Sequence, residues 1–221
     1  MAITLAILTP NADAIIMLNE DFTGTTLPSG WSFDTDGEWS IENNELSQGR
    51  ILTTPGHADC SAGDESWTDY LMSMRFKYIQ FGTNNMEAGV TIRGTNNAGG
   101  MTVRTSWRGS SWNLELMRSG MAELHVPLNQ NLTTGQWYDM KAKIEGDFLQ
   151  VWVNDVLYDF GDIYPSSPTF PSAGKIGLWS NNAYTHFDDV LVDDLQPVPE
   201  PASMVLLGIA LFGAGVARRK R

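Results

Sequence analysis

Apolar and polar side chains alternate along most of the chain. In residues 70–78 every second side chain is apolar, and three of the four positions between carry serine, arginine and lysine. The same period of two runs through residues 101–106, 112–116 and 137–144. Such a period places apolar side chains on one face of a β-strand and polar side chains on the other. It therefore predicts antiparallel strands with one buried and one solvated face.

Turn residues separate these segments at short intervals. Pairs such as Asn43-Asn44, Gly109-Ser110, Gly146-Asp147 and Asn154-Asp155 are typical of hairpin loops. No segment before the C-terminal tail keeps a helical period, and about a dozen strands are too many for one open sheet. The pattern predicts an all-β fold, a two-sheet antiparallel β-sandwich in one domain that covers residues 15–195.

Charge and cysteine content narrow the functional classes. The chain has 26 acidic and 14 basic side chains and a net charge of −12. An acidic domain of this kind disfavours nucleic-acid phosphate as a partner. Cys60 is the single cysteine, so no intrachain disulfide is possible. The three histidines share no metal-ligand spacing, so a zinc site is not expected.

The C-terminal tail has three parts with different physical roles. Residues 196–201 are a linker that contains the Pro-Glu-Pro motif Pro199, Glu200 and Pro201. Residues 202–217 are an apolar segment, and residues 218–221, which begin with Arg218 and Arg219, are a basic stop. As a helix, the apolar segment spans about 24 Å, which is short against a bilayer core of about 30 Å. The basic stop favours the cytoplasmic side of a membrane.

This tail resembles the PEP-CTERM sorting signal. In that family an exosortase in the inner membrane recognises the tail and removes it. The resemblance implies a protein exported by a Gram-negative-type bacterium, often one that makes exopolysaccharide. The chain would cross the inner membrane transiently, held by a C-terminal hydrophobic helix, and then reach the cell surface or extracellular matrix. An ordinary C-terminal membrane anchor is the alternative.

The N-terminal end supports export less directly. Ala12-Asp13-Ala14 has the small-x-small form of a signal-peptidase site. No lysine or arginine precedes Arg50, so the basic start of a signal peptide is missing. We expect residues 1–14 to be a truncated signal peptide; the alternative is that residues 15–22 are simply a first strand.

Several short motifs occur in an order that resembles a known superfamily. They are Asn19–Phe22, Glu38–Ile41, Gly135–Tyr138, Val151–Asn154, Gly174–Trp179 and Phe187–Val192. The order is similar to the concanavalin A-like lectin/glucanase jelly roll, which includes laminin-G-like domains and the keto-disaccharide hydrolase group. The resemblance implies a jelly roll over most of residues 19–195, and it does not determine a function.

Glycoside hydrolysis needs two suitably spaced carboxylates. Laminarinase-type glucanases of this superfamily carry Glu-x-Asp-x-x-Glu on a central strand, and that string is missing here. Glu115 has Asn113 and Met117 as its neighbours on the same face, with no second acid on its strand. A pair built from different strands stays open, so the sequence favours a non-catalytic protein without excluding an enzyme.

Four acids mark a candidate calcium site. Glu20 and Asp21 lie on the first predicted strand, and Asp188 and Asp189 lie on or beside the last. In related jelly rolls these strands are neighbours and often share a structural Ca²⁺, which binds six to eight oxygen atoms. A β-bulge near Asp188 would let the apolar residues on both sides of it face the core. The alternative is a solvated edge whose charges block strand addition.

Carbohydrate binding has the most candidates. Aromatic rings stack on sugars, and planar polar side chains hydrogen-bond to their hydroxyl groups. The candidate residues are Arg93, Arg104, Trp107, Trp112, Glu115 and Trp179. For each tryptophan, burial in the core is the alternative. If Trp107 binds sugar, its replacement by alanine abolishes polysaccharide retention with little loss of melting temperature.

These observations predict an exported surface or extracellular-matrix protein. Its β-sandwich would bind polysaccharide, including exopolysaccharide, without catalysis, and its sorting partner would be an exosortase. A glycoside hydrolase-like sugar-processing enzyme is one alternative. A purely structural matrix or adhesion module is the other.

Overall fold

The structure, a computed structural model, describes residues 15–51, 57–83, 85–95, 100–118, 124–163 and 171–195. The expected signal peptide 1–14, the linker 196–201, the apolar segment 202–217 and the basic stop 218–221 lie outside these residues, as do the sorting-motif side chains. None of the described segments forms a helix with the length and apolarity that a membrane crossing needs.

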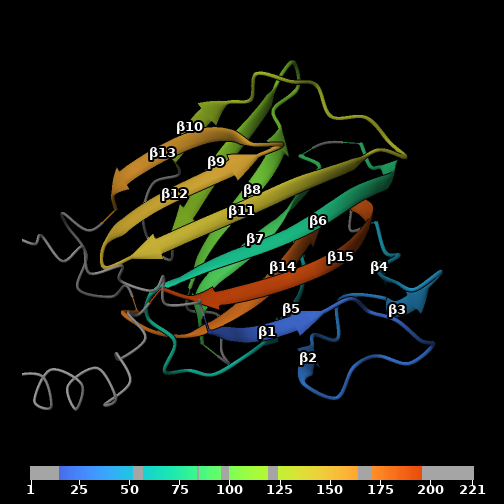
Figure 1. The fold of residues 1–221 in the computed structure, drawn as a ribbon. Coiled ribbons are helices and arrows are strands. Elements are labelled where there is room, and N and C mark those ends of the chain that lie inside the picture. The colour runs from blue at the N-terminus through green and yellow to red at the C-terminus, as the bar shows by residue number, and fades with distance from the viewer. Residues whose placement is uncertain are drawn as a thin grey trace, which may run out of the picture. The chain divides into compact units, whose positions relative to one another are not determined.

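Fifteen strands of the described residues form two antiparallel sheets (Figure 1). The eight-stranded sheet has the order β13-β12-β11-β6-β15-β4-β3, with β1 also paired to β15. Its strands are β1 (Ile16–Glu20), β3 (Trp39–Glu42), β4 (Glu45–Gln48), β6 (Tyr70–Phe81), β11 (Trp137–Glu145), β12 (Phe148–Val153), β13 (Val156–Asp162) and β15 (Ala183–Asp194).

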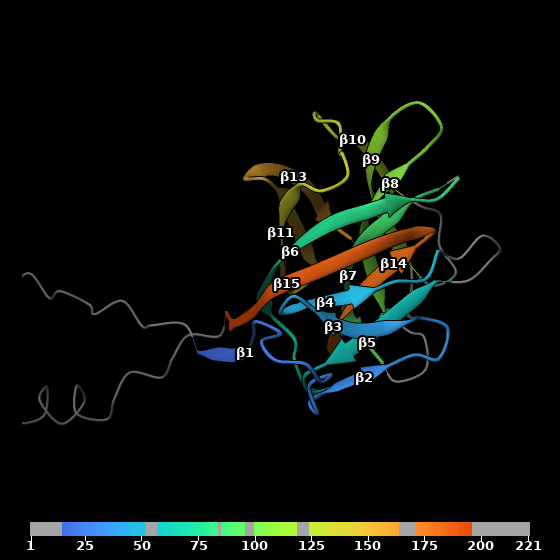
Figure 2. The ribbon, with the colours of Figure 1, turned by 90° about the vertical axis from the view of Figure 1, so that its right-hand side faces the viewer.

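The seven-stranded sheet has the order β10-β9-β8-β7-β14-β5-β2. Its strands are β2 (Trp31–Phe33), β5 (Ala58–Ala62), β7 (Glu87–Gly94), β8 (Met101–Trp107), β9 (Trp112–Arg118), β10 (Leu124–Pro127) and β14 (Lys175–Asn181). Figure 2 gives the view turned by 90°, in which both sheets can be followed by their labels. The predicted two-sheet antiparallel sandwich is confirmed.

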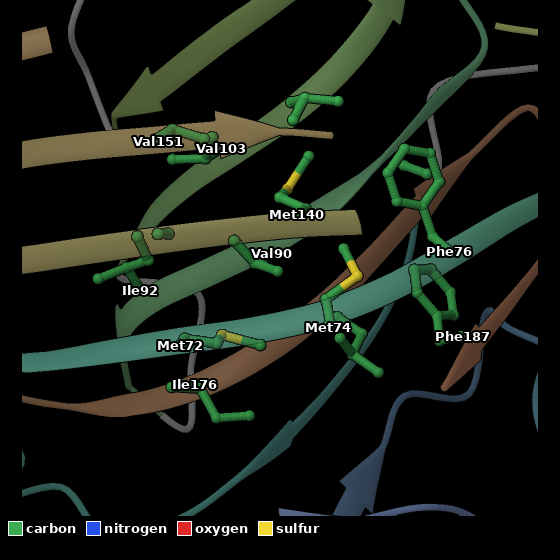
Figure 3. Close-up of a cluster of buried hydrophobic side chains, with 14 of the residues drawn as sticks. Met72, Met74, Phe76, Val90, Ile92, Val103, Met140, Val151, Ile176 and Phe187 are labelled. Atoms are coloured by element: carbon green, nitrogen blue, oxygen red, sulfur yellow. The ribbon is translucent and has the colours of Figure 1, made fainter. Parts of the chain in front are cut away.

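The core lies between the sheets and follows the period of two. On β6 the five alternate residues from Tyr70 to Tyr78 are at most 3% exposed. Figure 3 draws Met72 and Met74 of β6 and Met140 of β11 in one buried cluster with Val90 and Val103 of the other sheet. Burying each large apolar side chain contributes roughly 1.5–3 kcal/mol to stability. The strand pattern in the sequence therefore encodes the sandwich directly.

Two hairpin loops have the backbone that their sequence predicts. Asn43 and Asn44 have φ angles of 56° and 60°, and Asn154 and Asp155 have 49° and 62°. A two-residue hairpin loop with positive φ at both positions matches the twist of the strands that it joins, and asparagine adopts that conformation readily. The loops set the register of β3 with β4 and of β12 with β13.

Strand β15 contains the predicted bulge. Its register with β6 shifts between Asp188 and Leu191, and Asp189 has a φ of 50°. Because of this shift, Phe187 and Val190, three residues apart, are both fully buried. The prediction from apolar spacing alone is confirmed.

Candidate functional site

The outer face of the seven-stranded sheet carries a row of side chains from five adjacent strands. Strand register places Glu115 beside Arg104, Arg104 beside Gly89, Gly89 beside Trp179, and Trp179 beside Asp59. Residues that alternate with this row belong to the core, so the row points away from it. We call this row the Arg104 face and add to it three residues of neighbouring strand positions and two loop residues. The strand residues are Glu87, Asn181 and His125, and the loop residues are His57 and Arg108.

Arg104 is the centre of this face. Its Nη1 lies 2.9 Å from Glu87 Oε2, and its Nη2 lies 3.0 Å from Glu115 Oε2. The Arg104 side chain is 7% exposed, and those of Glu87 and Glu115 are 3% and 0% exposed. Removing one member of such a buried ion pair typically costs about 3–5 kcal/mol, because it leaves the other charge uncompensated. The three side chains therefore hold one another in fixed positions.

Arg108 and His125 also contact the Glu115 carboxylate. Arg108 donates to Oε1 from Nε at 2.5 Å and to Oε2 from Nη2 at 2.9 Å. His125 Nδ1 lies 3.1 Å from Oε1. Burial raises the pKa of Glu115, but the hydrogen bonds and charges of Arg108 and Arg104 outweigh it and hold the pKa below the ordinary 4.5. Glu115 is thus an ionised anchor for two arginines.

Glu87 has the opposite electrostatic character. Burial raises its pKa above the ordinary 4.5, and the charge of Arg104 and the hydrogen bond from Asn181 Nδ2, at 3.0 Å, offset only part of that rise. The nearby charge of Glu115 raises it further. A carboxyl group whose burial disfavours its ionised form is typical of functional sites.

Trp179 provides the aromatic surface of the face. It is partly exposed, and the imidazole of His57 stacks on it with ring centres 3.8 Å apart and planes tilted by 18°. His57 Nε2 lies 3.2 Å from Asp59 Oδ2, and both side chains are nearly half exposed. The indole therefore lies between a histidine–carboxylate pair on one side and the Arg104 cluster on the other.

Gly89 lies between Arg104 and Trp179 and, having no side chain, leaves room for them to approach each other. A Cβ at this position would lie 2.5 Å from the Arg104 Cα and closer still to the Val103 carbonyl oxygen, so backbone would have to move. Without a side chain at Gly89, the Arg104 guanidinium carbon reaches 6.0 Å from the centre of the Trp179 ring. That distance is at the outer limit of a cation–π contact.

The structure brings together three of the six sugar-site candidates. Arg104, Glu115 and Trp179 all lie on the Arg104 face, and Arg104 and Glu115 are direct partners across β8 and β9. Their placement on one outer surface agrees with the alternation in the sequence.

Arg93 does not belong to this face, so its prediction is wrong. It is 2% exposed and has a φ of 50°, which turns its side chain out of the strand alternation. Its Nη2 donates to the carbonyl oxygens of Thr68, at 2.7 Å, and Gly146, at 2.9 Å. Arg93 therefore joins two loops at the end of the sandwich.

Trp107 and Trp112 lie on the inner side of the sheet, so their assignment to an exposed sugar site is wrong. Trp112 is 4% exposed and packs against Tyr78 at 5.4 Å between ring centres. Trp107 is half-buried against the core, with its ring centre 5.7 Å from that of Trp112. The alternation in β8 puts Trp107 on the same side as Val103, and this pattern outweighs the proximity of both rings to the turn.

Glu87 is the most important residue that the sequence analysis missed. Glu87, Gly89 and Thr91 alternate with the apolar Ala88, Val90 and Ile92. That alternation was sufficient to put Glu87 on the outer face. Its pairing with Arg104 depends on strand order, which no local pattern contains. The result is a carboxylate pair from different strands, the case that the sequence left open.

The four calcium candidates do not gather into one group. Glu20 and Asp21 accept backbone hydrogen bonds from Phe22 and Thr23 in their own loop. Asp188 Oδ2 and Asp189 Oδ2 contact Arg75 at 2.6 and 3.0 Å. Within the described ranges no three histidine, cysteine, aspartate or glutamate side chains are placed to hold a metal ion. Calcium stays a prediction to which the described residues add no support.

The outer face of the eight-stranded sheet has its own polar network, which we call the His186 face; it comprises Glu42, Glu45, Lys77, Arg75, Trp137, Tyr184 and His186. Glu45 contacts Lys77 Nζ at 2.9 Å and His186 Nδ1 at 2.5 Å. Tyr184 OH donates to Glu42 Oε2 at 2.7 Å. Hydrogen bonds, with Tyr184 first, lower the pKa of Glu42, and the partners of Glu45 lower its pKa despite burial.

The family model described as "3-keto-alpha-glucoside-1,2-lyase-like domain" matches residues 17–193. A second model, the PEP-CTERM protein-sorting motif, matches residues 197–221, so the expected sorting signal is confirmed. None of the curated proteins matches this chain.

Solved structures confirm the jelly-roll fold. The carbohydrate-binding module CBM66 of Bacillus subtilis is 17% identical with a TM-score of 0.59, over 77% of this chain and 97% of that one. SCLam, a non-specific endo-β-1,3(4)-glucanase of family GH16, is 13% identical with a TM-score of 0.59, over 84% and 92%. The laminarinase of Rhodothermus marinus is 12% identical with a TM-score of 0.59, over 82% and 98%. At these identities the likeness concerns the fold.

Proposed function

The chain belongs to the family of 3-keto-alpha-glucoside-1,2-lyase-like domains, and from this premise we propose that it is an exported protein whose Arg104 face binds glycans. One observation carries the proposal, namely that a partly exposed indole shares this face with two buried carboxylates and an amide. A flat ring beside planar polar groups suits a sugar, which has an apolar face and a rim of hydroxyl groups.

His57 already covers part of the Trp179 ring. The imidazole is a flat group of about half the size of a pyranose face, and its side chain is 46% exposed. A sugar that displaces it exchanges one stacking contact for another, with little apolar area newly exposed to water. Trp179 therefore remains suitable as a sugar platform.

The PEP-CTERM motif indicates export through an exosortase to the cell surface. We propose that the domain meets its glycan there or in the extracellular matrix, and that exopolysaccharide is its natural partner. The net charge of −12 suits a soluble surface domain and disfavours phosphate polymers.

Affinity electrophoresis tests the binding proposal. The full chain, kept in a mild non-ionic detergent because of its apolar tail, is run through gels that contain single polysaccharides. We expect at least one neutral polymer to retard the wild type, and Trp179→Ala to lose most of that retardation. Trp137→Ala is the matched control, because Trp137 lies on the His186 face beneath Arg75 and Lys77, at 4.6 and 4.3 Å.

Equal losses in the two tryptophan variants would contradict the assignment of the glycan to the Arg104 face. Retardation by no polymer, including the host's own exopolysaccharide, would favour a purely structural matrix protein.

A second candidate function is the chemistry in the family's name. In a 3-keto-glucoside the ketone acidifies the hydrogen on C2; a base takes that proton, the electron pair forms a C1–C2 double bond, and the C1–O bond breaks. The departing oxygen then takes up a proton, so the products are an unsaturated keto sugar and an alcohol. Glu87 and Glu115 favour this candidate, because their pKa values are shifted in opposite directions around one arginine.

Release of nitrophenol from a nitrophenyl 3-keto-α-glucoside tests this second function. We expect turnover in the wild type and a loss of at least tenfold in kcat for Glu87→Gln, with Glu45→Gln on the His186 face unaffected. Binding of the substrate without any release would leave the protein as a glycan-binding domain.

A further inference from the structure

We propose that the Arg104 face selects neutral glycans and that Glu87 is the residue that excludes acidic ones. This inference rests on the proposed glycan binding, and it adds the chemical class of the ligand and the side chain that determines it.

The arginines of this face are already committed to carboxylates. Arg104 gives Nη1 to Glu87, and Nη2 and Nε to Glu115, at 2.9, 3.0 and 3.2 Å. Arg108 gives Nε and Nη2 to the same Glu115. Recognition of a carboxylate or sulfate on a sugar needs a guanidinium or ammonium group that can offer parallel donors to it. Arg104, whose side chain is 7% exposed, cannot do so without breaking an ion pair to a buried carboxylate, and Arg108 has its Nε/Nη2 edge on Glu115.

Negative charge surrounds the position where a sugar would lie. Glu87 is on one side of Trp179 and Asp59 is on the strand at its other side. An acidic sugar would bring a third anion into this partly desolvated region, and unfavourable like-charge contacts at an interface cost several kcal/mol. The same carboxylates accept hydrogen bonds from neutral hydroxyl groups, and Asn181 offers an amide beside them.

Glu87 is the determinant because it is the carboxylate with fewer partners in the cluster, so removing its charge disturbs the cluster less than removing that of Glu115. It makes one contact with Arg104, whereas Glu115 holds two arginines and His125. A glutamine at position 87 keeps a carbonyl oxygen for Arg104 Nη1 and removes the negative charge. The face would then have an arginine whose charge is only partly balanced, next to the tryptophan.

The experiment measures dissociation constants of the full chain in non-ionic detergent for two neutral polymers, laminarin and dextran, and two acidic ones, alginate and hyaluronan. We expect the wild type to bind a neutral polymer and to bind the acidic ones at least tenfold more weakly. For Glu87→Gln we expect the ratio of the alginate affinity to the neutral-polymer affinity to rise at least tenfold, and added salt to reduce that rise. Glu45→Gln removes the same charge from the His186 face and is expected to gain nothing.

A pH series on the wild type supplies a second measurement if Glu87→Gln folds poorly. Burial raises the pKa of Glu87 above the ordinary 4.5, so a falling pH removes its charge earlier than that of an ordinary glutamate, and alginate binding should rise. Arg104, Asn181 and Glu115 face Glu87. In a folded Glu87→Gln the part of the rise that is due to Glu87 disappears.

Wild-type binding of alginate as tight as that of the neutral polymer would overturn the selectivity. Neutral binding in both proteins with no gain for alginate in Glu87→Gln would overturn the role of Glu87 and leave the glycan-binding proposal intact. Absence of all glycan binding in the wild type would instead remove the proposed function together with this inference.

Discussion

The outer faces of the two sheets are both polar, and they differ in how their charges are satisfied. On the His186 face, Glu42 and Glu45 have lowered pKa values, and the pKa of Arg75 is raised first by its hydrogen bond to Asp188. On the Arg104 face, Glu115 is equally well held, but Glu87 has a raised pKa because its burial is only partly compensated. The Arg104 face therefore keeps one carboxylate at a cost in free energy, which Glu42 and Glu45 of the His186 face do not share.

This difference separates a structural surface from a candidate site. The hydrogen bonds and charges that lower the pKa values of Glu42 and Glu45 favour their ionised forms in the folded state. A desolvated carboxylate beside an aromatic ring gains hydrogen bonds when a hydroxyl group arrives, so its cost can be recovered on binding. The abundance of polar side chains alone does not distinguish the faces.

The largest effect should come from removing one carboxylate from each face, Glu115 from the Arg104 face and Glu45 from the His186 face. Glu115→Gln leaves Arg104 and Arg108 without their main anion, and we expect it to lower the free energy of unfolding by about 3–5 kcal/mol. Glu45→Gln loses charge-assisted hydrogen bonds at a partly solvated position, where the Glu45 side chain is 18% exposed. We expect about 1–2 kcal/mol there. Urea unfolding of both variants makes the measurement, and equal losses would mean that the two networks are equivalent.

Trp107→Ala tests whether Trp107 belongs to the core and not to the Arg104 face. Trp107 packs against Trp112 and the core, so we expect a loss of about 2–4 kcal/mol in urea unfolding. Glycan affinity of the folded fraction should stay within about twofold of wild type, because the ring does not point to the outer surface. A stable variant with abolished binding would restore the interpretation of Trp107 as a sugar-contacting residue.

The contributions of Glu42 and Glu87 to the free energy of unfolding should change with pH in opposite directions. We expect these changes to stay within about 1 kcal/mol, because one group is solvated and the other is partly compensated. Folding lowers the pKa of Glu42, so its contribution is present above 4.5 and is lost as the pH falls through the folded value. Folding raises the pKa of Glu87, so its contribution is present below 4.5 and is lost as the pH rises through the folded value.

Melting temperatures between pH 4 and 8 measure these trends. The advantage of wild type over Glu42→Gln should shrink as the pH falls. The advantage of wild type over Glu87→Gln should grow. Parallel trends in the two variants would show that both carboxylates are equally well compensated.

The sequence was sufficient for the sandwich because period-two alternation, hairpin loops and bulges are local. The strand from Tyr70, the Asn43-Asn44 loop and the bulge at Asp188 could each be derived from a few neighbouring residues. Strand order is not local, because it depends on which apolar faces pack together over the whole chain. That is why Arg104 and Glu115 were found on consecutive strands, while their partner Glu87 was not.

The prediction that Trp107 and Trp112 lie on an exposed surface failed for a related reason. A ring beside a turn is as compatible with the rim of the core as with an exposed platform, and Trp107 and Trp112 belong to that rim. Arg93 failed because its φ of 50° interrupts the alternation, and nothing in the residue type announces a positive φ.

The smallest expected effect concerns calcium on the His186 side of the molecule. A metal shared by β1 and β15 would need Asp188 and Asp189, and both already contact Arg75, whose single positive charge offsets part of theirs. We therefore expect EDTA to change the melting temperature of the full chain by less than about 1 °C, whereas a site occupied at a hundred times its dissociation constant would contribute about 2.7 kcal/mol. Arg75→Gln is the informative variant, because it releases both carboxylates. A fall of several degrees in wild type on EDTA, reversed by added Ca²⁺, would show that a bound metal stabilises the folded chain.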